Sequence, residues 1–146
     1  MRIGDILRAK GSAVATIATT ATVTEFLAEL AVHNIGAMVV VAPDGSGVRG
    51  IVSERDVVRH LHAHGPGVLG RAVAEIMTTE MVTCTPVDRV DDLAALMTNN
   101  RVRHIPVLDG GRLAGIVSLG DVVKNRMEEL QNEQRQLQAY ITQSGS

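Results

Sequence analysis

The chain has 146 residues, of which 45% are hydrophobic and 21% are charged, and its formal net charge is −2. This balance is typical of a soluble globular protein that is long enough to bury a core. With one Phe, one Tyr and no Trp, the core must be aliphatic, and aromatic platforms for stacking bases are excluded. Because Lys and Arg are neither in excess nor clustered, we expect no DNA-binding surface.

Signals for export or membrane insertion are weak. The single cysteine, Cys84, cannot form an internal disulfide, and charged residues occupy positions 2, 5, 8 and 10, where a signal peptide needs an apolar run. The longest weakly apolar stretch, residues 13–23, is short and is interrupted by threonines, so it cannot span a membrane. We therefore expect a cytoplasmic protein that has no membrane contact.

The first half of the chain predicts a lead-in segment at residues 3–7, then a helix, two strands and a second helix. Apolar residues at spacings of three and four predict a helix over residues 23–33. Continuous apolar runs at 37–41 and 48–53 predict two strands, which a turn-rich loop joins into a hairpin. A short helix then ends at the Gly-Pro-Gly sequence of residues 65–67.

The second half predicts the same order. Residues 73–77 mirror the first lead-in segment, a helix follows at 90–99, and strands follow at 104–108 and 113–118. Beyond the last strand, Met127, Leu130, Gln134, Leu137 and Ile141 alternate at spacings of three and four in a polar background. This pattern predicts one long amphipathic helix. We expect its apolar stripe to contribute to a subunit contact, and packing back on its own chain is the alternative.

An internal repeat explains this order. Residues 50–58 (GIVSERDVV) match residues 115–123 (GIVSLGDVV) at seven of nine positions with an offset of 65, and the preceding helix and strand match with an offset of 67. The change of two is an insertion in the hairpin loop at 42–49. A repeat of about 60 residues would be only marginally stable by itself, so we expect the two repeats to pack sheet to sheet around a pseudo-two-fold axis.

Both repeats place a serine and an aspartate three residues apart between a strand and a helix, as Ser53 and Asp56 and again as Ser118 and Asp121. Such pairs commonly form a capping box that satisfies helix-start amides, and this interpretation needs no ligand. Alternatively, the hydroxyl, the carboxylate and the free amides could bind the ribose and phosphates of a nucleotide. The spacing by itself leaves both interpretations open.

From about residue 3 to residue 127, the chain resembles a tandem pair of CBS domains (the cystathionine β-synthase type), as in small stand-alone bacterial proteins. The resemblance rests on the motif Gly, apolar, any residue, Ser or Thr, two residues, Asp, which both repeats match. It implies an α+β fold of two helix-strand-strand-helix repeats with an added C-terminal helix. The corresponding domains are residues 1–68 and 69–127, with an extension at 128–146.

The resemblance also implies two clefts for an adenosine nucleotide, in which the Asp holds both ribose hydroxyls and each cleft is shared between the repeats. The first cleft would contain Asp56, Ser53, Arg55 and Ile51 with Arg101, Arg103, His104 and Pro106. The second would contain Asp121, Ser118 and Ile116 with Ile35, Gly36, Ala37 and Val39, and with Lys10 or Ser12. Because Gly36, Ala37 and Val39 replace Arg103, His104 and Pro106, we expect two unequal sites.

Among family ligands the resemblance favours AMP or NAD, with ADP, ATP and S-adenosylmethionine as further candidates. We expect a non-catalytic homodimeric sensor that signals to a separate effector protein. Alternatives are a structural dimerisation scaffold with empty clefts, or an enzyme that acts on nucleotides through Ser53 or Ser118 with His104. The sequence contains no Rossmann or P-loop motif.

Two further features have plainer interpretations. His60 and His64 share a helix face at a metal-site spacing, but no nearby Cys, Asp or Glu completes four ligands, so we expect no metal site. Cys84 aligns with Ile17, an apolar strand position, so we expect a buried thiol rather than a reactive one.

Overall fold

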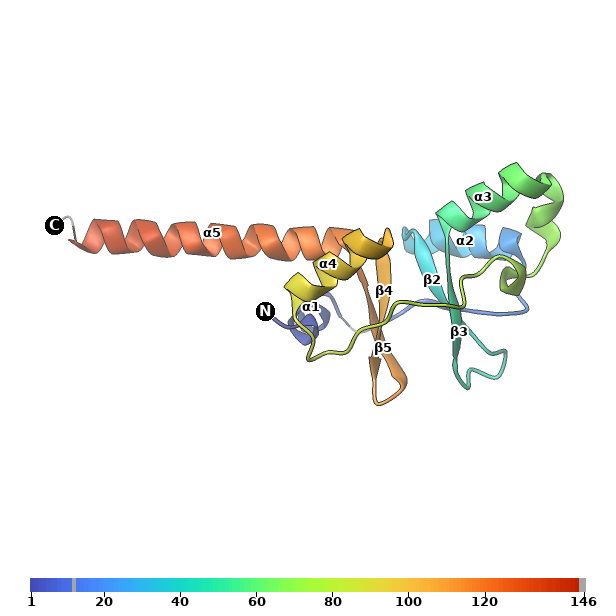
Figure 1. Ribbon diagram of the computed structural model, residues 1–146, viewed down its shortest axis with the longest axis horizontal. Helices are drawn as coiled ribbons and strands as arrows, with labels where there is room; N and C mark the ends of the chain where they lie inside the picture. Colours follow the sequence, from blue (N-terminus) through green and yellow to red (C-terminus); the bar gives the residue numbers. More distant parts are fainter. Residues whose placement is uncertain (12, 145–146) are drawn as a thin grey trace.

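The computed structural model describes residues 1–11 and 13–144, and its helices and strands follow the order of the repeat. The first half contains α1 (Ile3–Lys10), β1 (Thr16–Ala18), α2 (Val23–His33), β2 (Ala37–Val41), β3 (Val48–Ser53), α3 (Glu54–His64) and the 3-10 turn η1 (Pro66–Gly70). The second half contains the 3-10 turn η2 (Val73–Glu75), α4 (Val90–Asn100), β4 (His104–Asp109), β5 (Arg112–Ser118) and α5 (Leu119–Ser144). The expected α+β class with two repeats and a C-terminal helix is confirmed (Figure 1).

Each repeat is built on an antiparallel hairpin, β2 with β3 and β4 with β5. In the first repeat β1 adds to β2 in parallel, with Ile17 opposite Val40. The second repeat retains this pairing as a bridge between Cys84 and Val107. Cys84 is 4% exposed, and burial, with a contribution from the charge of Asp88, raises the pKa of its thiol to about 12. The predicted buried thiol is therefore confirmed.

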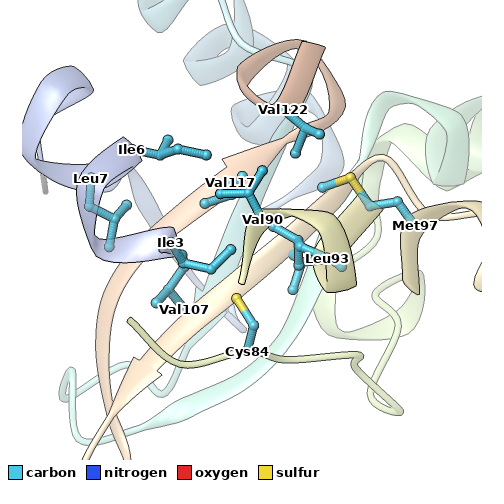
Figure 2. Packing of buried hydrophobic residues seen from close by; sticks show 11 residues of the cluster. Ile3, Ile6, Leu7, Cys84, Val90, Leu93, Met97, Val107, Val117 and Val122 are labelled. Carbon is cyan, nitrogen blue, oxygen red and sulfur yellow. The ribbon is translucent and has the colours of Figure 1, made fainter. Parts of the chain in front are cut away.

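The lead-in segments are exchanged between the repeats. Ile3, Ile6 and Leu7 of α1 are buried in the core of the second repeat, where Figure 2 shows them beside β4 and β5. In return, Val73 and Ile76 are buried in the core of the first repeat. Each packing unit thus contains chain from both sides of the boundary predicted at residues 68 and 69.

Backbone hydrogen bonds repeat the same exchange. The Ile3 amide donates to the Asp88 carbonyl at 2.9 Å, and the Val73 amide donates to the Ala21 carbonyl at 2.7 Å. These two bonds are equivalent under the pseudo-two-fold relation, because residues 3 and 88 correspond to residues 73 and 21. The two repeats are therefore interlocked, and neither core is complete without the other lead-in segment.

The first glycine of each motif permits this exchange. A Cβ atom built on Gly50 would lie 2.6 Å from the Thr78 carbonyl oxygen, and one built on Gly115 would lie 2.5 Å from Cδ2 of Leu7. Both distances are shorter than a Cβ atom normally makes, so a side chain at Gly50 would push against the backbone at Thr78, and one at Gly115 would force the Leu7 side chain to move. The motif glycines thus have a packing role that is independent of any ligand.

The helix α5 begins on the second repeat, where Val122 and Asn125 are buried, and then leaves it. From Arg126 to Gln143 every side chain is exposed except that of Glu129, which is half-buried. Figure 1 shows this part as a single rod that extends away from both hairpins. The alternative that the apolar stripe of α5 is covered by its own chain is therefore wrong for Met127, Leu130, Leu137 and Ile141, which are all exposed. Among the described residues, no helix combines the length and apolar character needed to cross a membrane.

Candidate functional site

The turn from β3 into α3 holds Asp56 in a capping box. The Ser53 amide donates to Oδ2 of Asp56 at 2.8 Å, and the Asp56 amide donates to the Ser53 hydroxyl at 3.3 Å. Nη2 of Arg59 donates to Oδ1 of Asp56 at 2.9 Å. Asp56 is only 7% exposed, so its carboxylate is fixed in orientation before any ligand arrives.

The turn from β5 into α5 repeats the box with a different cation. The Ser118 amide donates to Oδ2 of Asp121 at 2.9 Å, and the Asp121 amide donates to the Ser118 hydroxyl at 3.1 Å. Here Nζ of Lys10, at the end of α1, donates to the same Oδ2 at 2.6 Å and to the Ile116 carbonyl at 2.9 Å. The cation thus comes from the exchanged lead-in segment rather than from the helix that the box caps.

The predicted Asp56 cleft corresponds to a cavity of about 160 Å³ between the two hairpins. Seven of the eight residues predicted for this cleft line it: Ile51, Ser53, Arg55, Asp56, Arg101, Arg103 and His104. The eighth, Pro106, is buried in the sheet opposite Ile116 and is not among the lining residues. The expectation of a wall shared by both repeats therefore matches the geometry, and the ligand contacts themselves stay predictions.

The Asp56 cleft carries many charges. Four arginines line it, two from each repeat, namely Arg55, Arg59, Arg101 and Arg103. Three carboxylates, Glu54, Asp56 and Glu80, lie among them. One positive charge is left over when His104 is neutral, and guanidinium groups are suited to bidentate binding of phosphate oxygens. This wall can accept an anionic group next to a fixed carboxylate.

Arg101 occupies an unusual backbone conformation. It ends α4 with φ 54° and ψ 40°, in the left-handed region, and its equivalent at the end of α2 is Asn34 with φ 52°. Asn tolerates this region better than Arg, which has no short polar group to bond locally. A local cost is therefore accepted at the position that brings a guanidinium group to the Asp56 cleft, as is common for residues with a functional role.

The predicted Asp121 cleft corresponds to a wider hollow of about 670 Å³. Of the residues predicted for it, Lys10, Ile35, Gly36, Ala37, Ile116, Ser118 and Asp121 line it. Val39 is fully buried and does not reach the hollow. Ser12 lies outside the described residues. Since Lys10 and Asp121 form its ion pair, this cleft presents little net charge compared with the other.

Two opposing effects act on Asp121. Burial acts to raise the pKa of its carboxyl group, but hydrogen bonds from Lys10 and Ser118 and the charge of Lys10 outweigh burial and lower that pKa. Asp121 is therefore ionised at neutral pH, and both partners of the pair are partly shielded, with 34% of the Lys10 side chain and 22% of the Asp121 side chain exposed. A ligand hydroxyl that binds this carboxylate must share it with the ammonium group.

His104 lies at the junction of the two clefts and lines both of them, as do Gly36 and Ala37. Burial lowers the pKa of its imidazole, and the nearby carboxylates of Glu54 and Asp121 only partly oppose that effect. The ring is thus neutral at neutral pH and can act as both donor and acceptor. These three residues are therefore common to the walls of both clefts.

Several lining residues were not predicted. The Asp56 cleft also contains Arg59, Thr78, Glu80, Met81 and Val82, and the Asp121 cleft also contains Ala13, Val14, Ala15, His33 and Asn34. The internal repeat could have predicted one of them, Glu80. Residues 3–7 match residues 73–77 with an offset of 70, and the same offset takes Lys10 to Glu80. The remaining ones depend on how the linkers after α1 and η2 cross the hairpins.

A third hollow of about 780 Å³ lies against the start of α5. It is lined by Glu54, Arg103 and His104 on one side and by Val123, Met127 and Gln131 of α5 on the other. Neither aspartate reaches it. We therefore do not assign it to the same function.

The histidines of α3 do not gather acidic or thiol ligands. The rings of His60 and His64 stack with centroids 5.8 Å apart. Within residues 1–11 and 13–144, no group of three or more His, Cys, Asp or Glu side chains is arranged to hold a metal ion.

Comparison with known proteins gives consistent matches over both repeats. The family model for the CBS domain matches residues 3–63 and 73–128. The Arabidopsis thaliana "CBS domain-containing protein CBSX3, mitochondrial" is 37% identical over 95% of this chain and 71% of its own length. The crystal structure of the CBS-domain containing protein ATU1752 from Agrobacterium tumefaciens has a TM-score of 0.83 at 41% identity, covering 86% of this chain and 99% of that one.

A further solved structure carries ligands. The CBS domain pair of protein MJ0100, described in complex with 5′-methylthioadenosine and S-adenosyl-L-methionine, has a TM-score of 0.77 at 25% identity. The match covers 88% of this chain and 98% of that one.

Proposed function

The chain belongs to the CBS-domain family, and from this premise we propose that it is a sensor that binds adenosine-containing nucleotides in its two clefts. One observation carries the proposal: each cleft presents a pre-oriented aspartate on one repeat and faces the first hairpin strand of the other repeat, β4 or β2. A carboxylate with two oxygens is suited to the two hydroxyls of a ribose. The adenosine ligands of the MJ0100 pair support the same ligand class.

The two clefts are proposed to take different ligands. Four arginines in the Asp56 cleft favour a nucleotide with phosphates, so AMP or NAD is our first choice, and ADP or ATP would use the same groups. The Asp121 cleft offers Lys10 alone, and Asp121 already holds it. We expect this cleft to bind the adenosine part of a ligand more strongly than its phosphates.

Binding is proposed to shift the arrangement of the repeats. At about 160 Å³ the Asp56 cavity is smaller than the roughly 300 Å³ at which small-molecule pockets begin, so a nucleotide must separate its walls. Those walls belong to different repeats, and Gly36, Ala37 and His104 link this movement to the second cleft. Ligand would thus select one arrangement of the pair, and a separate effector protein would read the changed surface.

We further propose that the working unit is a homodimer without catalytic activity. Exposed apolar side chains on four helices, Val32 of α2, Val58 of α3, Leu96 of α4 and Val123 of α5, support self-association. Ser53, Ser118 and His104 have no arrangement of nucleophile, base and orienting group, because both serines are engaged with aspartates. Prolonged incubation with AMP, ATP or NAD should therefore give no product.

The test is a thermal-shift titration with AMP, ADP, ATP, NAD and S-adenosylmethionine, repeated on Asp56→Ala and Asp121→Ala. A ligand that binds only the folded chain raises Tm once its concentration exceeds Kd. We expect the Tm rise with AMP or NAD to be smaller in Asp56→Ala, which leaves only the Asp121 cleft, and each substitution to cost about 1 kcal/mol of stability through the lost cap.

The competing function is a dimerisation scaffold, which the capping boxes favour because they explain both Ser and Asp pairs without a ligand. It predicts the same loss of about 1 kcal/mol per substitution and no ligand response in any variant. A flat titration of the unmodified chain at millimolar ligand would therefore replace the sensor with the scaffold.

A further inference from the structure

Beyond Asn125, α5 projects from the second repeat with its apolar side chains exposed. Residues 126–143 are exposed apart from Glu129, and Figure 1 shows the helix extending past the second repeat. It nevertheless carries large apolar side chains in water, with Met127 57% exposed, Leu130 50% and Leu137 62%. Most helix stability in proteins comes from packing an apolar face, so this face requires an occupant.

The spacing of the apolar face indicates what kind of occupant it fits. Val123, Met127, Leu130, Leu137 and Ile141, with Gln134 among them, form a stripe (the α5 stripe) whose spacings alternate between four and three. Each position of the stripe recurs after seven residues, as Val123, Leu130 and Leu137 do, which is 3.5 residues per turn over two turns, whereas an ideal helix turns once every 3.6 residues. A stripe of this period stays in contact with a partner only when two helices coil around each other with a left-handed twist.

The charges beside the stripe argue against a membrane or nucleic acid as the occupant. From residue 124 to residue 135, Lys124, Arg126 and Arg135 are balanced by Glu128, Glu129 and Glu133. A helix that lies on an anionic surface needs a basic polar face, and this face is neutral overall. The stripe is also narrow, so it matches one other helix better than a broad apolar surface.

We propose that the α5 stripe pairs with the α5 stripe of a second copy of this chain, parallel and in register, as a two-stranded coiled coil. In this register Gln134 lies opposite Gln134 of the second copy, where two side-chain amides can each donate and accept. In the longest antiparallel overlap Gln134 would lie opposite Leu130, which leaves a shielded amide without a partner. A single polar residue at such a core position is known to fix register and orientation.

The flanking positions agree with the parallel register. In a parallel pair, residues that flank the core contact flanking residues five positions further along the other helix. Arg126 would then contact Gln131 of the second copy, and Glu133 would contact Gln138 of the second copy. The antiparallel pair would instead place Glu133 next to Glu133 of the second copy, and like charges in contact destabilise the pair.

The register is tested by engineered disulfides in the full chain. Cys84 is 4% exposed and its thiol pKa is raised to about 12, so the native cysteine gives little background. We expect Gln134→Cys to form a covalent dimer rapidly on mild oxidation, at least tenfold faster than the matched control Arg135→Cys, which lies one position outside the stripe. Equal rates for the two variants, or no covalent dimer from Gln134→Cys, would overturn the parallel in-register pair.

Self-association is tested by sedimentation equilibrium. The double variant Leu130→Lys with Leu137→Lys should weaken dimerisation at least tenfold, whereas Asn132→Lys with Gln136→Lys adds the same charge off the stripe and should not. All four side chains are exposed in the single chain, so the melting of the two cores should be unchanged in both variants. If the leucine variant keeps the dimer mass of the unmodified chain, α5 is not the contact.

Discussion

The two clefts share a frame and differ in the charges placed on it. Both are bounded by a Gly-Ile-Val-Ser strand, by a serine and an aspartate in a capping box, and by the first hairpin strand of the other repeat, β4 or β2. In the Asp56 cleft the aspartate is paired with Arg59 of its own helix, and Glu80 lies on the wall. In the Asp121 cleft the aspartate is paired with Lys10, the residue that corresponds to Glu80.

This difference separates what the repeat needs for folding from what it can vary. The glycine, the serine and the aspartate are kept in both halves because they permit close packing and cap a helix. The cations and anions around them lie on solvent-accessible walls, where a change of sign costs little stability. The two repeats thus share one frame, and their clefts carry different charges.

The largest expected difference between the repeats is in the motif glycines. Gly50→Ala should cost about 3 kcal/mol of unfolding free energy and Gly115→Ala only about 1 kcal/mol. At Gly50 the obstacle is the Thr78 carbonyl, which the Ile51 amide holds at 3.0 Å, whereas at Gly115 it is the Leu7 side chain, which can rotate. Urea denaturation of the two variants measures both costs.

A double variant checks the cause. Leu7→Ala combined with Gly115→Ala should lose about 1 kcal/mol less than the sum of the single losses, because Leu7→Ala removes the side chain that obstructs a Cβ atom at position 115. Additive losses, or a larger loss for Gly115→Ala than for Gly50→Ala, would contradict the packing explanation.

The next largest effect is expected on ligand affinity, when Lys10 and Glu80 are each replaced by the residue that the other cleft has at the equivalent position. Lys10→Glu should weaken AMP binding at the Asp121 cleft and Glu80→Lys should strengthen it at the Asp56 cleft, each by about fivefold at low salt, or about 1 kcal/mol. Each effect is measured by calorimetric titration with the other cleft disabled: Lys10→Glu is combined with Asp56→Ala, and Glu80→Lys is combined with Asp121→Ala. Lys10→Met and Glu80→Gln, which remove the charge without reversing it, should give about half the effect in free energy. Unchanged affinity at low salt would show that these side chains do not reach the ligand.

A smaller effect concerns the left-handed position at the end of α4. Arg101→Asn copies the residue that the first repeat has at the equivalent position, Asn34, and should raise the free energy of unfolding by about 0.5 kcal/mol. The same variant should lose affinity for phosphate-bearing ligands in the Asp56 cleft. A variant that is less stable than the original chain would contradict the strain argument, and unaltered AMP binding would remove Arg101 from the cleft's ligands.

The smallest effect is a dependence on acid. Burial lowers the pKa of His104 in the folded chain below its ordinary value of 6.5, so the unfolded chain binds a proton first as pH falls. The stability that depends on a neutral His104 ring is therefore fully present above about pH 6.5. It is lost progressively as the pH falls from there towards the pKa of His104 in the folded chain. His104→Gln should therefore lose less stability than the original chain between pH 7.5 and pH 5.5, measured by urea denaturation. Parallel losses in the two proteins would contradict this assignment.

The sequence by itself determined the repeat, the class of fold and the two Ser and Asp pairs. Apolar periodicity and turn residues are local properties, so the helix at Val23–His33 and the strands at Ala37–Val41 and Val48–Ser53 agree with their predicted bounds. Identity between the halves then predicted that Cys84 would take the buried place of Ile17. These features depend on neighbours in the chain or on the repeat alone.

Only the tertiary structure decided which distant residues meet. The residue pattern placed each lead-in segment before its own repeat, but the chain packs each on the other repeat. The family resemblance already implied Lys10 in the Asp121 cleft, whereas Glu80 in the Asp56 cleft was not predicted. Val39 and Pro106 lie on the same strand faces as Ala37 and His104, two residues further along, but both are buried there and neither lines a cleft. Such contacts depend on how segments cross in space, and the local pattern of residues carries no record of that crossing.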